Sequence, residues 1–219
     1  MEPPHPTGPG YLDARRPLAF AHRGGAYHPD IEGLENTLAA FTHAVELGYT
    51  YLETDVHVTS DGVLLAFHDT VLDRVTDRTG SIADSTYDEV RQAMIGGRER
   101  VPTLGDLFDA FPGARFNIDL KSEGAVESLS RFIEEREAWD RVLVGSFSGR
   151  RMNAFRRRTG GRVATSAHPP GGRVSFARST TKNTIANATA TTSGAATTTS
   201  ARLRVVMPSL TQLSDEMTA

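Results

Sequence analysis

Apolar and polar positions along the chain alternate in a way that predicts strands separated by helices. Residues 18–21 form a short apolar run, and residues 51–58 alternate between a more apolar and a more polar set of side chains. Because successive side chains of a strand point to opposite faces, the second segment has two distinct faces. Its more polar face carries Tyr51, Glu53, Asp55 and His57. Both segments are therefore predicted to be strands, and the second presents acids from one face.

The same pattern continues to about residue 166. Asp61-Gly62 is a strong two-residue turn signal, so the strand that follows it should return antiparallel to the one before. The predicted strands are 18–21, 51–58, 63–67, 116–120, 141–147 and 162–166. The predicted helices are 37–47, 85–94, 103–111, 126–137 and 150–158. Strands that alternate with helices indicate an α/β fold with a parallel sheet covered by helices.

The two ends of the chain do not follow this pattern. Residues 1–16 are rich in Pro and Gly, which predicts a flexible arm. Residues 179–201 contain 9 Thr, 6 Ala and 3 Ser with Ile185 as the one large aliphatic residue, so disorder is expected there. Residues 203–217 regain enough apolar character for one strand or one helical turn. We predict a low-complexity or aberrant tail over 168–219.

Composition narrows the class of protein. The 219 residues include no cysteine, which excludes disulfides and thiolate metal sites. No apolar run follows Arg15-Arg16 and none is long enough to cross a bilayer, so we expect a cytoplasmic protein without a membrane span. Residues 141–219 hold 12 Lys and Arg against 2 acids, but the arginines are scattered without interleaved aromatic residues. Nucleic-acid binding is therefore not expected.

Charged side chains gather where the predicted strands end. These positions are His22 and Arg23, Glu53 and Asp55, His68, and Asp119 and Lys121. In a barrel of parallel strands, side chains at the carboxyl ends converge on one mouth. The set suits phosphodiester cleavage, since three carboxylates offer oxygen ligands to a hard divalent cation. The Arg and the Lys could hold phosphate oxygens, and the two imidazoles could serve as acid and base.

Six short segments in a fixed order resemble the glycerophosphodiester phosphodiesterase family. They are His22-Arg23-Gly24, Glu35-Asn36-Thr37, Glu53-Thr54-Asp55-Val56, Phe67-His68-Asp69, Val101-Pro102-Thr103-Leu104 and Asn117-Ile118-Asp119-Leu120-Lys121. The resemblance implies a TIM-type (β/α) barrel and hydrolysis of glycerophosphodiesters to glycerol 3-phosphate and an alcohol. It implies Mg²⁺ or Ca²⁺ at Glu53, Asp55 and Asp119, and His22 and His68 as the catalytic pair. Which histidine is the acid and which the base stays open.

Several of these residues have simpler alternative roles. Glu35 faces the pocket in the family, but together with Asn36 it could instead cap the first helix. Asp119 and Lys121 could form a plain ion pair. His57 shares a face with Glu53 but is expected to be structural.

The resemblance covers residues 17–167, with 69–100 matching a small insertion, and about five of eight barrel strands can be recognised there. Three further strand–helix units would need roughly 90 residues, but only 52 follow Ala167. Members often carry Glu at the position of Asp119, and the late Trp of the family has no counterpart, because the single Trp is Trp139. The alternative function is therefore an inactive remnant of such an enzyme, truncated or frameshifted. A phospholipase-D-like toxin relative is disfavoured by the missing signal peptide and cysteines.

Overall fold

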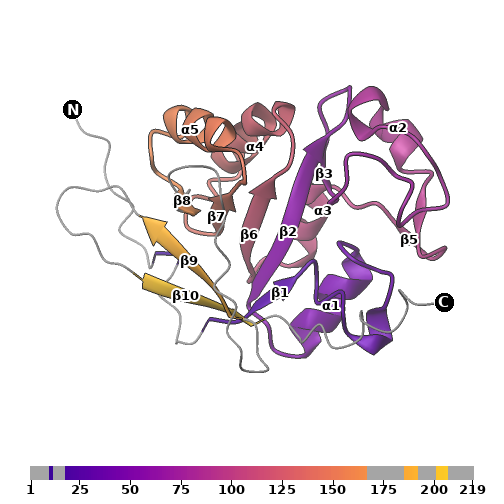
Figure 1. Cartoon of the computed structure of the whole chain (residues 1–219), viewed down its shortest axis with the longest axis horizontal. Coiled ribbons are helices and arrows are strands. Elements are labelled where there is room, and N and C mark those ends of the chain that lie inside the picture. The colour runs from indigo at the N-terminus through magenta and orange to yellow at the C-terminus, as the bar shows by residue number, and fades with distance from the viewer. Residues whose placement is uncertain (1–9, 12–17, 167–184, 192–200, 207–219) are drawn as a thin grey trace, which may run out of the picture.

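The computed structural model describes residues 10–11, 18–166, 185–191 and 201–206. Its centre is a sheet in which five strands run parallel in the order β1, β2, β6, β7, β8 (Figure 1). These strands are β1 (Phe20–His22), β2 (Tyr51–Val58), β6 (Arg115–Leu120), β7 (Val142–Gly145) and β8 (Ala164–Ser166). Strand β3 (Leu64–Ala66) returns antiparallel to β2 after the Asp61-Gly62 turn, as its sequence predicts.

Four helices cover one face of this sheet and enclose the main core. They are α1 (Leu38–Glu46), α3 (Leu104–Ala110), α4 (Gly124–Glu135) and α5 (Gly149–Arg158). Their buried faces pack against the strand residues that alternate with the polar ones, such as Leu52 and Val56 of β2 and Phe116 of β6. Three of the helices begin at a Ser or Thr whose hydroxyl accepts a hydrogen bond from the first turn: Thr37, Thr103 and Ser148. This arrangement leaves the other face of the sheet as the inner face.

The amino end of the inner face is filled by apolar and aromatic side chains. We call this group the amino-end cluster; its buried members are Tyr11, Leu18, Phe20, Tyr51, Leu143 and Ala164. The Tyr51 hydroxyl donates to the Tyr11 carbonyl at 2.6 Å and accepts from Arg115 Nη1 at 3.1 Å. Since this end is packed with side chains, the polar residues farther along the same strands are displayed at the carboxyl end.

Residues 69–100 form a small unit that shares a hydrophobic cluster with Leu65 of β3, Phe67 and Val101. It contains the 3₁₀ turn η2 (Ile82–Asp84), the short helix α2 (Tyr87–Val90) and the hairpin of β4 (Met94–Ile95) and β5 (Glu99–Arg100). Its buried apolar residues include Leu72, Ile82 and Ile95. The helix predicted over 85–94 is much shorter in the structure, because the chain turns at Gln92-Ala93 and enters β4 at Met94.

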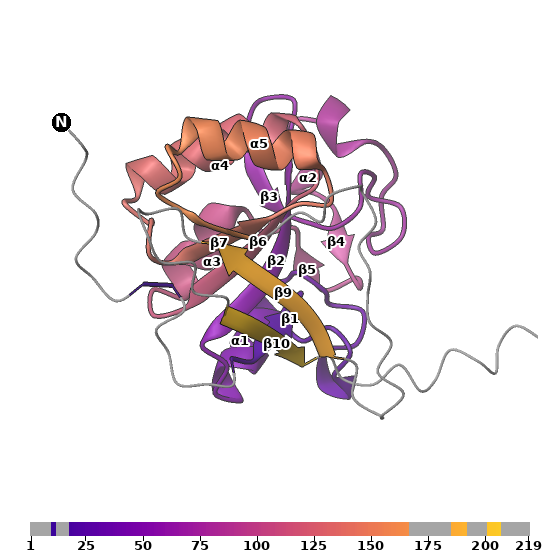
Figure 2. The same cartoon turned by 60° about the vertical axis from the view of Figure 1, so that its left-hand side comes forward.

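Two of the expectations for the chain ends need correction. Tyr11 was assigned to a flexible arm but is 4% exposed, because its ring packs edge-on against Tyr51. Strand β9 (Ile185–Thr191) lies in the segment expected to lack regular structure, and it pairs antiparallel with β8. Strand β10 (Ala201–Val206), seen beside β9 in Figure 2, falls mostly in the segment for which one strand was among the expectations. Alternating β-branched Thr suits a strand, and the free edge of β8 offers backbone partners. The rest of the predicted tail and arm lies outside the described residues.

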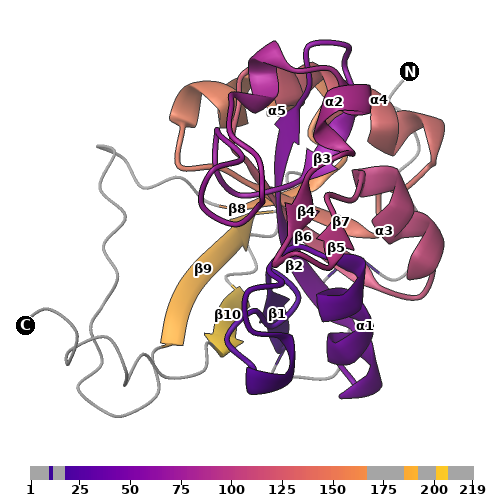
Figure 3. The same ribbon diagram turned by 90° about the vertical axis from the view of Figure 1, so that its right-hand side faces the viewer.

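Figure 3 shows β9 and β10 on the opposite side of the sheet from α1 and α3. The two strands pair antiparallel with each other over their whole length. Within the described parts of the chain, no helix has both the length and the apolar character needed to cross a bilayer.

Candidate active site

Acids from two neighbouring strands meet at the carboxyl end of the sheet. Asp55 of β2 and Asp119 of β6 are paired in the parallel register, so their side chains lie side by side on the inner face. Lys121 Nζ lies 2.9 Å from Asp55 Oδ1 and 2.8 Å from Asp119 Oδ2. The two carboxylate oxygens are therefore no farther apart than the sum of these distances. Asp55 is 2% exposed and Glu53 is 9% exposed, so this charge lies mostly out of water.

Arg23 joins the acids of β2 to the loop that follows β1. Its backbone N–H donates to Glu53 Oε2 at 3.0 Å, and its Nη1 donates to Glu35 Oε1 at 3.1 Å. Its Nε lies 3.3 Å from Asp55 Oδ2, which makes an ion pair without hydrogen-bond geometry. Arg23 adopts a φ of 50°, in the left-handed region that non-glycine residues seldom occupy. This strained backbone turns the Arg23 N–H toward Glu53.

Gly24 allows that loop to pack against α1. With a φ of 79° it lies in the region that favours glycine, and a Cβ at this position would come 2.8 Å from the Ala40 Cβ. A larger residue would therefore push the loop away from the helix, together with the neighbouring His22 and Arg23.

His22 stands at the end of β1, beside the acids. Its Nε2 is 3.9 Å from Glu53 Oε2, and its ring stacks on Tyr27 at 5.9 Å between centroids with 8° between the planes. Burial and the nearby Arg23 guanidinium lower the pKa of His22 to about 4. The imidazole is thus neutral at neutral pH in this environment, which a proton acceptor requires.

His68 is oriented by a carboxylate on the next residue. Its Nδ1 donates to Asp69 Oδ1 at 2.6 Å, so Nε2 is the ring nitrogen left to take up a proton. Arg74, from the 69–100 unit, donates from Nε to Asp69 Oδ2 at 2.6 Å and from Nη2 to Glu35 Oε1, also at 2.6 Å. Glu35, predicted as a possible pocket residue, thus links Arg74 to Arg23 and is not a helix cap; the cap of α1 is Thr37.

The eight predicted site residues therefore lie in one connected group, which we call the mouth: His22, Arg23, Glu35, Glu53, Asp55, His68, Asp119 and Lys121. Its acids lie close to one another, and the pKa of Glu53 shows the effect. Burial raises the pKa of Glu53 to about 8, and the nearby Asp55 and Asp119 add to the effect. For Lys121, burial acts to lower the pKa, but Asp55 and Asp119 outweigh it and the pKa lies above its usual value. With all its carboxyl groups ionised, the mouth would hold more buried negative charge than its own cations offset, and the raised pKa of Glu53 is the consequence.

This excess negative charge fits a divalent cation. Asp119 Oδ1 is buried and, among the described residues, has no hydrogen-bond partner. The oxygens of Glu53, Asp55 and Asp119 do not lie as a compact triad: in the described part of the chain, the one group of three potential ligands within 4.8 Å of one another is His28, Asp30 and His43. Lys121 lies between Asp55 and Asp119, so these carboxylates would need to close around an ion as Lys121 moves aside.

Three residues shape the mouth in ways that the sequence did not predict. Asn36, with a φ of 59°, donates from its amide to Asp55 Oδ2 at 3.2 Å and accepts from Thr54 Oγ1 at 2.8 Å. Arg74 stands in a polar stretch without periodicity, so nothing marked it out. Phe147 is 61% exposed and lies 5.6 Å from Lys121 Nζ. An aromatic residue at the carboxyl end of the predicted strand 141–147 is the signal that could have identified it.

The sequence model of the glycerophosphoryl diester phosphodiesterase family matches residues 22–207. This chain belongs to that family. The match begins at His22, includes every residue of the mouth, and continues past Ala167, where the recognisable motifs end.

Individual members of the family agree with this assignment. The chain is 40% identical over 150 residues to a probable glycerophosphodiester phosphodiesterase of Mycobacterium tuberculosis, covering 68% of this chain and 56% of the relative. It is 36% identical over 145 residues to a glycerophosphodiester phosphodiesterase of Caldanaerobacter subterraneus, covering 60% and 58%. The chain thus spans little more than half the length of these curated relatives.

Solved structures of the family share the fold. An Oleispira antarctica phosphodiesterase, solved in complex with the product sn-glycerol-3-phosphate, superposes with a TM-score of 0.62 at 26% identity, covering 71% of this chain and 69% of that one. A Galdieria sulphuraria protein described as a glycerophosphodiester phosphodiesterase superposes with a TM-score of 0.60 at 27% identity, covering 68% and 63%. The parallel sheet with helices on its outer face is accordingly the TIM-barrel architecture of glycerophosphodiester phosphodiesterases.

Proposed function

We propose that this chain hydrolyses glycerophosphodiesters to glycerol 3-phosphate and an alcohol with the help of a divalent cation. The observation that carries the proposal is the pair of carboxylates from adjacent parallel strands, Asp55 and Asp119, both within 3 Å of Lys121 Nζ and joined through Arg23 to Glu53. Acids, cations and imidazoles converge there at the carboxyl ends of the strands, where barrel enzymes carry their active sites.

Glu53, Asp55 and Asp119 would hold the cation. All three offer oxygen, which is the donor that Mg²⁺ and Ca²⁺ prefer. A bound divalent cation polarises a phosphoryl oxygen and lowers the pKa of a bound water or hydroxyl. The partnerless Asp119 Oδ1 and the raised pKa of Glu53 support a cation here, because both are costs that positive charge would relieve.

Arg23 and Lys121 would bind the phosphate of the substrate. Arg23 offers a planar guanidinium, which can make two parallel hydrogen bonds to phosphate oxygens, and Lys121 offers a mobile point charge. Both pair with carboxylates of the mouth, so their charges already stand where the phosphate would arrive. A cation on the carboxylates would free both side chains for the substrate.

The two imidazoles would move the protons. One of them takes a proton from the attacking oxygen, and the other gives a proton to the departing alcohol oxygen. Because Asp69 fixes the Nδ1 proton of His68, the Nε2 of His68 is the atom available for this transfer. His22 would use its Nε2, which points toward Glu53.

The experiment is hydrolysis of glycerophosphocholine by the full chain, followed by enzymatic detection of glycerol 3-phosphate. We expect activity with Mg²⁺ or Ca²⁺ and none in excess EDTA. His22→Ala and His68→Ala should each reduce the rate by about 10²–10⁴-fold, whereas Asp88→Asn, an acid on the exposed face of α2, should leave it unchanged. Equal rates with and without EDTA would refute the role of the metal.

The second candidate is an inactive relative that keeps the mouth but does not turn over substrate. It is favoured by β9, which runs antiparallel to β8 where a further barrel strand would run parallel. In that case the chain should bind Mg²⁺ or Ca²⁺, seen as a calorimetric signal that Asp119→Asn removes, while no glycerol 3-phosphate is released. Release of glycerol 3-phosphate above the His22→Ala background would exclude this candidate.

A further inference from the structure

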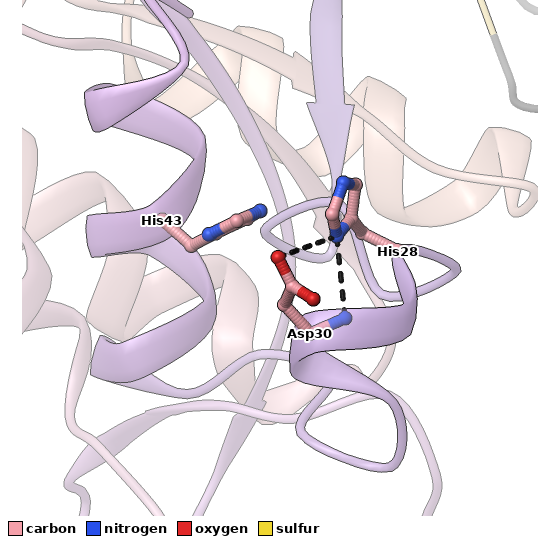
Figure 4. Close-up of side chains that lie close together, drawn as sticks. All are labelled: His28, Asp30 and His43. Atoms are coloured by element: carbon pink, nitrogen blue, oxygen red, sulfur yellow. Dashed lines mark hydrogen bonds and ion pairs between the residues drawn. The ribbon is translucent and has the colours of Figure 1, made fainter.

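A second group of metal-type ligands lies outside the mouth, between the loop after β1 and helix α1. His28 and Asp30 belong to the turn around η1 (Pro29–Ile31), and His43 projects from the middle of α1. Figure 4 shows the three side chains facing one another across the gap between these elements. One ligand atom from each lies within 4.8 Å of the others. From this geometry we propose that His28, Asp30 and His43 form a Zn²⁺ site.

The spacing of the donors is close to what such an ion needs. Two ligands at 2.0–2.1 Å from a tetrahedral zinc ion lie roughly 3.3–3.5 Å apart. His28 Nδ1 and Asp30 Oδ2 are separated by 3.6 Å. The His43 ring lies 4.5 Å from the His28 ring between centroids, at an angle of 53°. A small rotation of the exposed Asp30 and half-buried His28 side chains would bring all three donors onto one ion.

The ordinary explanation for this group is a turn with a surface ion pair. The backbone N–H of Asp30 does donate to His28 Nδ1 at 3.3 Å, so His28 caps the turn. That explanation leaves His43 out, because its Nε2 is buried and, within the described residues, has no hydrogen-bond partner. An unpaired buried nitrogen is unfavourable unless something binds it. A metal ion would give this nitrogen a partner.

The surroundings of Asp30 differ from those of most acids in and beside the mouth. Glu35, Asp55, Asp69 and Asp119 each pair with an Arg or a Lys, whereas Glu53 pairs with His22. In the part of the chain that the structure describes, Asp30 pairs with His28 alone. No fixed cation therefore competes with a metal ion for the Asp30 carboxylate.

The donor set selects the class of metal. Two imidazoles and one carboxylate suit Zn²⁺, whereas Mg²⁺ and Ca²⁺ prefer oxygen ligands alone. Three protein ligands leave a fourth position for water. The site is therefore chemically distinct from the all-oxygen site of the mouth, and it does not depend on the proposed hydrolase activity.

Zinc at this position would fasten the middle of the loop between β1 and α1 to the helix. The residue before His28 is Tyr27, whose ring stacks on His22 at the mouth. Holding His28 against α1 would fix Tyr27, and through it the orientation of the His22 ring. Since a ligand that binds only the folded state stabilises it, Zn²⁺ should also raise the melting temperature.

The test is a Zn²⁺ titration of the full chain, metal-stripped and without a polyhistidine tag, in excess Mg²⁺ so that the carboxylates of the mouth are satisfied. We expect one Zn²⁺ per chain. Asp30→Asn and His43→Gln should each weaken binding by about tenfold or more. Glu46→Gln, an exposed acid at the end of α1, and Asp119→Asn should bind like the unaltered chain. Asp30 is exposed, so its variant should fold even if the His43 variant does not.

Two further readouts make the outcome decisive. Co²⁺ in place of Zn²⁺ should give the intense visible absorption of a four-coordinate ion, and Asp30→Asn should abolish it. Zn²⁺ should raise the melting temperature of the unaltered chain but not that of Asp30→Asn. The proposal is overturned if no Zn²⁺ binds, if Asp30→Asn and His43→Gln bind Zn²⁺ normally, or if Asp119→Asn alone loses it, which would assign the ion to the mouth.

Discussion

The inner face of the sheet is built from opposite kinds of side chain at its two ends. At the amino end, the amino-end cluster is aromatic and aliphatic, and the hydroxyl of Tyr51 is satisfied by Tyr11 and Arg115. At the carboxyl end, the mouth buries Glu53 and Asp55 beside Asp119 and leaves one carboxylate oxygen without a partner. The same strands supply both ends, only two to four residues apart.

The comparison shows that the amino end of the inner face stabilises the fold and the carboxyl end destabilises it. Burying apolar surface at the amino end stabilises the fold by roughly 25 cal/mol per Å². Gathering like charges at the carboxyl end costs free energy, as the raised pKa of Glu53 indicates. Mutations at the two ends should therefore separate stability from activity.

The largest expected effect is on activity, from Asp119→Asn. Removing one carboxylate from the mouth should lower kcat/KM by about 10³-fold or more, because a metal ion supplies several kcal/mol of transition-state stabilisation. The melting temperature should stay within about 2 °C, since Lys121 keeps Asp55 as a partner. Steady-state assays and thermal melts by circular dichroism measure the two quantities. A large drop in melting temperature with intact activity would show that the carboxyl end serves stability and not activity.

The opposite result is expected for Leu143→Ala in the amino-end cluster. Leu143 is 1% exposed, and its truncation should lower the free energy of unfolding by about 2–5 kcal/mol through lost burial and a cavity. The matched change Leu143→Met keeps the volume and should cost less than about 1.5 kcal/mol. Urea unfolding measures both, and kcat of the folded fraction should not change. If Leu143→Ala and Leu143→Met were equally stable, packing in the amino-end cluster would not be the source of stability that the comparison of the two ends assumes.

A smaller effect is expected from Asp69→Asn at the rim of the mouth. Asp69 orients the His68 imidazole through Nδ1, so its loss should lower kcat by about 10–100-fold, the usual cost of losing such a partner. KM should change little, because Asp69 does not reach the phosphate-binding residues. A structural role alone would instead lower the melting temperature and leave kcat per folded molecule unaltered.

The smallest effect concerns acid stability. Arg74 and, more weakly, His68 lower the pKa of Asp69 to about 2, and for Glu35 the hydrogen bond from Arg74 and the charge of Arg23 outweigh burial to lower its pKa as well. The folded state therefore holds fewer protons than the unfolded state between about pH 5 and pH 2, and stability is lost as the pH falls through that window.

Arg74→Met should reduce the free energy of unfolding that is lost as the pH falls, by up to about 1 kcal/mol. The effect is this small because the Arg74 side chain is 48% exposed and solvent screens the pair. Arg91→Met, which removes an equally exposed arginine from a helix ion pair, should leave the pH dependence of stability unchanged. Urea unfolding at pH 5, 4 and 3 compares the three proteins. If the free energy of unfolding fell equally with pH in Arg74→Met and in the unaltered chain, the proposed role of Arg74 in acid stability would be wrong.

Much of the fold could be predicted from the sequence because its signals are local. The alternation in residues 51–58, the Asp61-Gly62 turn and the polar ends of the strands placed the parallel sheet and its order of elements. The site residues could be named for the same reason: a side chain at a strand end must lie at the mouth whatever the helices do. Their catalytic and metal-binding roles remain predictions.

Other features depend on contacts between distant segments, which periodicity does not encode. Arg74 reaches Glu35 across 39 positions, and nothing in its neighbourhood signals that contact. Tyr11 stands in a Pro/Gly-rich stretch but is buried by Tyr51. Composition also misled at Ile185–Thr191, where a segment of mainly Ala and Thr forms a strand because β8 provides an edge to pair with.

The bridge from Lys121 to Asp55 and Asp119 has a consequence for how the sheet assembles. If β6 slipped by a single residue along β2, Asp119 would turn from the inner face into the apolar layer under the helices, and Lys121 would follow it. Burying those charges without their partners would make the slipped arrangement strongly unfavourable. Asp119 and Lys121, which are proposed to bind the cation and the phosphate, thus also disfavour folding with β6 out of register against β2.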